Sequence, residues 1–198
     1  MKLYITRHGE TKRNKEQRVL GRTDDPLSEK GKAQAAELAE KMKDIEVDII
    51  YTSPLSRAKD TAETVAKSKG MSVIVDDRLI ETNFGDFEGK TAGELELDPR
   101  FAQWVAGKIP TPNGESNSDF VKRLCVGLQQ IVLDMLENDI EHSAVIMHGG
   151  AIMMLLGACG VPQAKPVEWN ADCGQGYSIL VTPSLYHKTG VVEVVGII

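Results

Sequence analysis

Short β-rich runs alternate with helical stretches along the whole chain, and this alternation strongly limits the possible folds. The expected strands are Lys2–Thr6, Val47–Thr52, Ser72–Val75, Ala144–Met147, Tyr177–Thr182 and Val191–Val195. The expected helices are Lys30–Lys43 (entered through Ser28), Leu55–Lys69, Asp119–Asn138 and one that follows the fourth strand through Leu156. This order predicts an α/β fold, a three-layer α/β/α sandwich with a mostly parallel sheet. The last two strands are expected to add an antiparallel edge.

No repeat, low-complexity tract or linker rich in Pro, Gly and Ser divides the 198 residues. We therefore expect a single domain over residues 1–198. A loop-rich stretch with short helical pieces runs from about Arg78 to Asn117. Within it, residues 91–119 are expected to form an insertion that roofs a substrate pocket, because loops on a rigid scaffold carry variation in specificity.

Charge and composition exclude several classes of protein. The formal net charge of −6 argues against a general nucleic-acid binder, which would carry a basic stripe. The longest nearly apolar run, Ala151–Val161, is too short to span a membrane and contains two glycines. The first residues lack the pattern of a signal peptide. The three cysteines form no CxxC pair, which predicts a reducing, cytoplasmic compartment and no cysteine zinc site.

Chemically active residues follow four of the expected strands. Arg7 and His8 come after the first strand, Arg57 after the second, Glu81 after the third and His148 after the fourth. In folds of this class, ligands bind beyond the carboxyl ends of the strands. We therefore expect one crevice to collect two arginines, two histidines and an acid.

Arg57 has two interpretations. Ser53 is a suitable N-cap and Pro54 a suitable first helical residue, which would place Arg57 in the first turn of a helix. A cation there opposes the helix macrodipole. Either Arg57 is a solvated side chain paired with Asp60 or Asp77, or an anion binds at this helix start and meets both Arg57 and free N–H groups.

The two histidines are interpreted in the same way. His8 can attack phosphorus if one ring nitrogen is unprotonated, and a backbone carbonyl that accepts from the other nitrogen would fix that tautomer. Arg7 can hold two phosphate oxygens through its planar fork. His148 precedes Gly149 and Gly150, which would let an anion approach the backbone closely. His148 is thus either a structural hydrogen-bonding residue or a third cation.

Six ordered blocks resemble the histidine phosphatase superfamily, in its phosphoglycerate mutase-like branch, over nearly the whole chain. The blocks are Arg7-His8-Gly9-Glu10-Thr11 with Asn14; Gly21-Arg22, Asp25-Pro26-Leu27-Ser28 and Gly31, followed by Gln34-Ala35; Ser53-Pro54-Leu55 with Arg57-Ala58 and Thr61-Ala62; Glu81 with Phe84-Gly85 and Glu88-Gly89; Gly114-Glu115-Ser116; and His148-Gly149-Gly150. One departure is Arg13, where many members of the family have an aromatic residue.

The resemblance implies a set of catalytic roles. His8 would be the nucleophile that becomes phosphohistidine. Arg7, Arg57 and His148 would bind the phosphoryl group. Glu81 would protonate the leaving oxygen and then activate water. These roles suit phosphoryl transfer, which depends on positioning and charge stabilisation.

Further residues are expected to bind phosphate or substrate, namely Asn14, Gly21 and Gly149. No cofactor and no metal ion is expected, since the four histidines show no zinc-ligand spacing.

Glu81 has four rivals for the role of acid. Asp76 and Asp77 are suited to pair with Arg78 or Lys69, Glu88 to brace its loop, and Asp86 lies nearby.

The preferred function is that of a metal-independent phosphomonoesterase, of the histidine acid-type phosphatases, acting on a small phosphorylated metabolite. One alternative is a 2,3-bisphosphoglycerate-dependent phosphoglycerate mutase. Mutases of the family are generally longer and carry a C-terminal tail, whereas Phe84–Gly89 is similar to the phosphatases. The other alternative, a non-catalytic phospholigand-binding module, would require a lost catalytic residue. A homodimer is expected, with no nucleic-acid or membrane partner. Candidate substrates include sugar phosphates, phosphoglycerates and α-ribazole phosphate.

Overall fold

The computed structural model describes residues 1–198 and contains seven strands that form one sheet. The strands are β1 Lys2–Arg7, β2 Ile49–Thr52, β3 Val73–Val75, β4 His142–Met147, β5 Gly160–Val161, β6 Gly176–Leu180 and β7 Val192–Ile197. The α-helices are α1 Lys12–Lys15, α2 Glu29–Met42, α3 Ser56–Lys69, α4 Ala92–Glu96, α5 Pro99–Val105, α6 Asn117–Glu137, α7 Gly149–Cys159 and α8 Pro183–Thr189. Single 3-10 turns lie at Asp77–Leu79, Gly85–Phe87 and Pro166–Trp169.

The sheet has the strand order β3-β2-β4-β1-β6-β7-β5. Strand β1 runs parallel to β4, which is parallel to β2, and β2 is parallel to β3. Only β6 runs against its two neighbours, β1 and β7. The mostly parallel sheet is confirmed. The last two expected strands, β6 and β7, add the antiparallel pairing on that side of the sheet, as expected, but the outermost strand is the two-residue β5, which pairs in parallel with β7.

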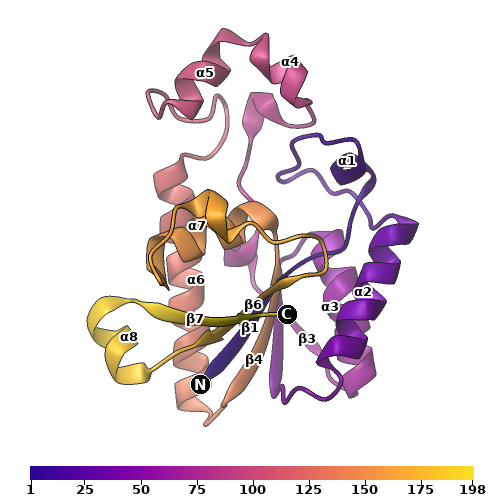
Figure 1. Ribbon diagram of the computed structural model, residues 1–198, viewed down its shortest axis with the longest axis vertical. Helices are drawn as coiled ribbons and strands as arrows, with labels where there is room; N and C mark the ends of the chain where they lie inside the picture. Colours follow the sequence, from indigo (N-terminus) through magenta and orange to yellow (C-terminus); the bar gives the residue numbers. More distant parts are fainter.

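Helices cover both faces of the sheet (Figure 1). Helices α2 and α3 pack on one face, where Tyr4 of β1 and Ile146 of β4 are buried. Helices α6 and α7 pack on the other face over Leu3 and Ile5 of β1. Alternate residues of one strand thus enter two different cores, as the period of a β-strand requires. The arrangement confirms the three-layer sandwich.

The start of α2 follows from a local sequence signal, whereas the N-cap expected for α3 is wrong. Ser28 caps α2, since its Oγ accepts from the N–H of Gly31 at 3.0 Å. The expected N-cap Ser53 does not cap α3: the helix begins at Ser56 after Leu55. Pro54 is therefore not its first residue. The Ser53 hydroxyl instead lies 2.7 Å from the ring of His148.

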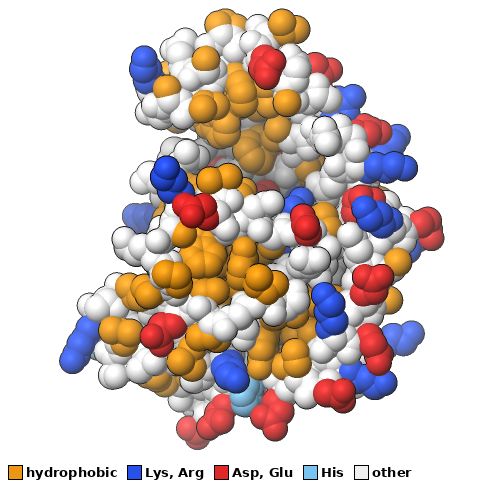
Figure 2. Space-filling model, in the orientation of Figure 1, with side chains coloured by type: hydrophobic (Ala, Val, Ile, Leu, Met, Phe, Trp, Pro, Cys, Tyr) orange, Lys and Arg blue, Asp and Glu red, His pale blue; other side chains and the backbone are white.

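Helices α4 and α5 stand at one end of the molecule, above the sheet (Figure 1). Aromatic rings join them to the preceding loop, because Trp104 packs against Phe84 and Phe87 with ring centroids 6.3 and 5.6 Å apart. Arg100 of α5 forms ion pairs with Asp98 at its own start and with Asp86 of the same loop. Figure 2 shows that the molecule is hollowed beneath this part and that hydrophobic side chains gather on the upper wall of the hollow.

No helix of the structure combines the length and the apolar character that crossing a membrane requires.

Candidate active site

The carboxyl ends of the parallel strands bring the predicted site residues together around His8. Its Nδ1 lies 2.7 Å from the carbonyl oxygen of Gly9. A carbonyl only accepts, so Nδ1 carries the ring hydrogen and Nε2 keeps its lone pair. Burial and the neighbouring Arg57 and Arg7 hold the pKa of His8 well below its usual value. The imidazole is therefore neutral, with an unprotonated Nε2, the form that can act as a nucleophile.

Arg57 is fully buried and reaches His8 directly. Its Nε donates to His8 Nε2 at 3.2 Å. The two terminal nitrogens donate to the carbonyls of Gly21 at 2.6 Å and Thr23 at 2.9 Å. The interpretation of a solvated Arg57 paired with an acid is wrong. The loop at Gly21–Thr23 instead fixes the plane of the guanidinium beside the histidine ring.

Arg7 approaches the same ring from the end of β1. Its Nη1 donates to the carbonyl of Ala171 at 2.9 Å, and its buried Nε has no partner. Gly149 makes room for this side chain, since a Cβ there would lie 3.2 Å from the guanidinium carbon. A buried donor on a cation without a hydrogen-bond partner favours the binding of an anionic ligand, which can accept that hydrogen bond.

Gly21 holds the site together through its backbone. Its carbonyl accepts from Arg57, and its N–H donates to the carboxylate of Glu88 at 2.8 Å. The backbone N–H and the carbonyl of Gly21 therefore both form hydrogen bonds within the protein. The expectation that Gly21 binds phosphate or substrate stays a prediction, and its observed contacts fix Arg57.

Glu81 is buried close to the start of α7. Its Oε2 accepts from the N–H of Gly150 at 3.0 Å, and its Oε1 accepts from the N–H of Thr82 at 2.9 Å. Gly150 allows this approach, since a Cβ there would lie 2.8 Å from Oε1. Burial raises the pKa of Glu81 against the opposing effect of these hydrogen bonds and of Arg57. The environment thus favours the protonated acid.

Three of the four rival carboxylates bind other groups of the protein. Asp76 binds Arg78 through Nη2 at 2.8 Å. Glu88 accepts from the backbone of Gly21 and Thr23, and so braces the loop as expected. Asp86 binds Arg100 and the amide of Asn113. Glu81 is the one carboxylate that lines the cavity at His8.

His148 lies beside His8, with ring centroids 5.1 Å apart and ring planes at 62°. Its Nε2 is 2.7 Å from Ser53 Oγ, while its buried Nδ1 has no partner. Burial, Arg57 and His8 hold the pKa of His148 well below its usual value. Of the two interpretations of His148, this low pKa favours the neutral hydrogen-bonding residue over the third cation.

A cavity of about 230 Å³ opens at His8. Of the predicted site residues, it is lined by Arg7, His8, Asn14, Glu81 and Gly149, and the neighbouring Gly150 also lines it. Arg57, His148 and Gly21 lie behind this surface. The other lining residues are Arg18, Val19, Leu20, Phe84, Met153 and Asn170. Sequence reasoning missed five of these, all except Phe84. Only Met153 could have been found from the sequence, because it lies one helical turn after the predicted Gly149 and therefore on the same face of α7.

No group of three or more His, Cys, Asp or Glu side chains is placed to hold a metal ion. The site itself offers two neutral histidines and one buried carboxyl among two arginines. That metal is not required stays a prediction.

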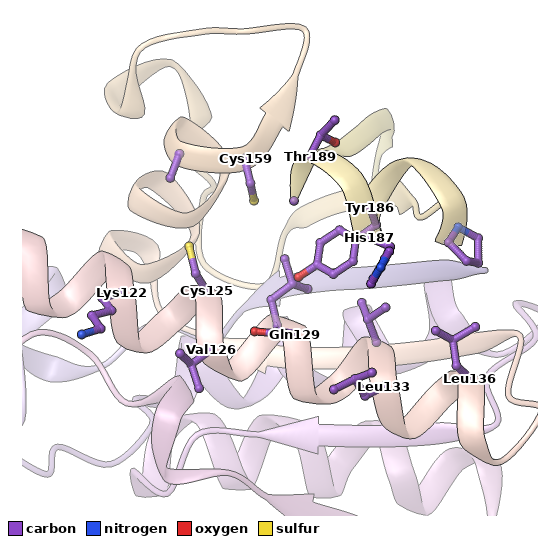
Figure 3. A pocket seen from close by; sticks show the side chains of 15 residues that line it. Lys122, Cys125, Val126, Gln129, Leu133, Leu136, Cys159, Tyr186, His187 and Thr189 are labelled. Atoms are coloured by element: carbon purple, nitrogen blue, oxygen red, sulfur yellow. The ribbon is translucent and has the colours of Figure 1, made fainter.

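A separate groove of about 500 Å³ lies between α6 and α8, away from His8 (Figure 3). Leu133 and Leu136 of α6 line one side, and Tyr186 of α8 lies on the other side. None of the predicted site residues touches this groove. The expected homodimer stays a prediction.

Titration of the buried histidines should make the fold less stable at mildly acidic pH. In the unfolded chain a histidine binds a proton below about pH 6.5, whereas folded His148 stays neutral to a much lower pH. Its stabilisation is thus present above about pH 6.5 and lost as the pH falls below it. Between about pH 6.5 and 5, wild type should lose up to about 1.4 kcal/mol more per pH unit than His148→Gln.

Urea unfolding of both proteins at several pH values measures this difference. Comparing the two proteins is necessary because Glu81 acts in the opposite direction. Its raised pKa gives a stabilisation that is lost as pH rises above its unfolded value. Equal pH slopes for wild type and His148→Gln would contradict the assignment of a neutral His148.

Comparison with known proteins places the chain in a family. The model of the histidine phosphatase superfamily (branch 1) matches residues 3–184. "Putative phosphoserine phosphatase 2" of Hydrogenobacter thermophilus is 34% identical, over 81% of this chain and 80% of the relative. "Probable phosphoglycerate mutase GpmB" of Erwinia tasmaniensis is 31% identical, over 79% and 73%. A mycobacterial glucosyl-3-phosphoglycerate phosphatase solved with VO3 superposes with a TM-score of 0.82 at 26% identity, covering 98% of this chain and 96% of that one. With these matches and the His8 site in one fold, the chain belongs to the histidine phosphatase superfamily, branch 1.

Proposed function

We propose that the protein is a phosphomonoesterase that works through a phosphohistidine at His8. The observation that carries this proposal is the state of the His8 ring. Its Nδ1–H donates to the carbonyl of Gly9. Its Nε2 carries no proton, and the lone pair there accepts a hydrogen bond from Arg57. A neutral imidazole fixed in one tautomer and flanked by two guanidinium groups is prepared to attack a phosphoryl group.

The reaction divides into two transfers. First, His8 Nε2 forms a bond to phosphorus while the bond from phosphorus to the ester oxygen breaks. The leaving oxygen takes the proton of Glu81. In the second transfer, the Glu81 carboxylate removes a proton from water, whose oxygen attacks phosphorus. The bond to Nε2 then breaks, which releases inorganic phosphate and returns Glu81 to its protonated form.

The charged groups of the site suit this sequence. Burial favours the protonated Glu81 that the first transfer uses. Arg7, Arg57 and His148 would stabilise the charge on the phosphoryl oxygens. Asn14 lines the cavity, and its amide would donate to the same oxygens.

The cavity wall favours hydrolysis over mutase activity. A phosphoglycerate mutase must hold a carboxylate as well as a phosphate, which requires a second free cation. Besides Arg7, the wall offers only one cation, Arg18, whose guanidinium already binds Glu16, Glu94 and the carbonyl of Gly89. The remaining wall is largely apolar at Val19, Leu20 and Phe84.

Residues 91–119 are proposed as the roof of this pocket. Phe84 lines the cavity, and Trp104 of this segment packs edge-on against it. We propose that the substrate is a small phosphorylated metabolite and that the compartment is the cytoplasm, in keeping with three free cysteines.

A panel of phosphomonoesters, each assayed with and without 2,3-bisphosphoglycerate, tests the proposed reaction. We expect release of inorganic phosphate without the bisphosphate, with activity unchanged in EDTA and inhibited by vanadate, a mimic of pentacoordinate phosphorus. Interconversion of phosphoglycerates that depends on the bisphosphate and exceeds hydrolysis would favour the mutase. Loss of activity in EDTA that Mg²⁺ or Zn²⁺ restores would contradict the metal-free reaction.

The role of Glu81 can be tested by the leaving group. An alkoxide needs a proton as its bond to phosphorus breaks, whereas p-nitrophenolate needs it far less. Glu81→Gln should therefore slow the phosphorylation of His8 much more for alkyl phosphates than for p-nitrophenyl phosphate. Pre-steady-state measurement isolates this step from the attack of water. Equal slowing for both substrates would show that another group supplies the proton.

A further inference from the structure

Ser53 is a buried polar residue that neither the helix start nor the proposed reaction uses. It follows β2 directly, and its N–H donates to the carbonyl of Ile146 at 3.1 Å. This hydrogen bond extends the pairing of β2 with β4 by one residue. His148 lies one residue beyond the end of β4. The sheet therefore sets the Ser53 hydroxyl against the His148 ring, with Oγ and Nε2 2.7 Å apart.

The partners of Ser53 determine which way this hydrogen bond runs. The only other group bonded to Oγ is the N–H of Leu55 at 3.4 Å, which is a donor. No acceptor other than His148 Nε2 is within hydrogen-bond reach of the hydroxyl hydrogen. The hydroxyl consequently donates to Nε2, and a neutral His148 must carry its hydrogen on Nδ1.

The second ring nitrogen of His148 has no hydrogen-bond partner. His148 Nδ1 is buried and has no partner in the protein. A buried N–H without a partner costs free energy, which a ligand acceptor recovers on binding. The ring lies edge-on to His8, at a centroid distance of 5.1 Å. An oxygen of a phosphoryl group carried by His8 is the acceptor that this position would supply.

We propose that Ser53 is a positioning residue that fixes His148 as the Nδ1–H tautomer and so directs its one free donor to the transferring phosphoryl group. The inference rests on the proposed function for its consequence, but the tautomer itself is a property of the protein and does not depend on turnover. It can therefore be measured separately from turnover.

Nitrogen-15 NMR of histidine-labelled protein near pH 7.5 measures the tautomer. Comparison with His148→Gln assigns the His148 ring among the four histidines. In wild type we expect a protonated Nδ1 and an unprotonated Nε2. Ser53→Ala should move the hydrogen wholly or partly to Nε2, and Ser53→Thr should restore the wild-type pattern. A protonated Nε2 in wild type, or an unchanged pattern in Ser53→Ala, would overturn the proposal.

Kinetics tests the consequence. Loss of a residue that orients a functional histidine typically costs about 10- to 100-fold, so kcat of Ser53→Ala should fall within that range and recover in Ser53→Thr. Ser143→Ala is the matched control, because Ser143 is a buried serine of β4 whose hydroxyl has no partner. Unchanged kcat in Ser53→Ala would contradict the positioning role. A wild type without phosphatase activity would remove the proposed function, while the NMR result would still decide the tautomer.

Discussion

His8→Ala should abolish turnover and leave the fold intact. Removing the nucleophile of a hydrolytic enzyme that uses a covalent intermediate costs roughly 10⁴- to 10⁶-fold in kcat. No nearby group replaces it, because His148 is hydrogen-bonded to Ser53 through one ring nitrogen and lies behind the cavity surface. The measurement is steady-state release of phosphate, with circular dichroism to confirm the fold.

Rapid-quench experiments on wild type should trap phosphate on His8, with the stability in base and lability in acid of a phosphohistidine. His187→Ala is a suitable control, because His187 lies in the groove at α8, away from the cavity. Near-normal turnover by His8→Ala would end the phosphohistidine mechanism.

Arg57→Ala should lower kcat by roughly 10²- to 10³-fold, the usual cost of removing one preorganised group that stabilises a transition state, and Arg57→Lys should recover only part of that loss. Lysine keeps the positive charge but has no planar fork. Arg57 uses that fork to bind the carbonyls of Gly21 and Thr23 while its Nε faces His8. A single ammonium cannot occupy all three positions, so charge alone recovers only part of the rate.

Steady-state kinetics of Arg57→Lys, Arg57→Ala and a control measure this effect. The control is Arg100→Lys, since Arg100 also donates through several nitrogens but pairs with Asp86 and Asp98 under α5. Full activity in Arg57→Lys would show that the orientation of the guanidinium does not matter to catalysis.

The alternation of strands and helices predicted the architecture because each element carries its own hydrophobic period. It also predicted that Arg7, His8, Arg57, Glu81 and His148 would meet, since parallel strands present their carboxyl ends at one edge. Short elements were missed. Strand β5 has two residues and helix α8 seven, so neither has a measurable period. The outermost position of β5, beyond β7, depends on pairing between distant segments, which no local pattern shows.

Contacts between distant segments also explain what the sequence did not reveal about the site. Arg57 is fixed by the backbone carbonyls of Gly21 and Thr23, and every residue type carries such a carbonyl, so the side chains at these positions give no signal of this role. Asn170 reaches the cavity from a loop far along the chain. Ser53 was assigned to a helix cap because serine suits that position, whereas the pairing of β2 with β4 gives it to His148.

The attachment of α4 and α5 has a consequence for how this architecture diversifies. Their ties run mainly to residues 84–90, through Trp104 on Phe84 and Phe87 and through Arg100 on Asp86. Neither His8 nor Arg57 contributes to that attachment. If residues 91–119 roof the pocket as proposed, substitutions in α4 and α5 can alter what the pocket admits while His8 and Arg57 keep their geometry. Under the proposed function, a changed roof would then select a different metabolite for the same reaction.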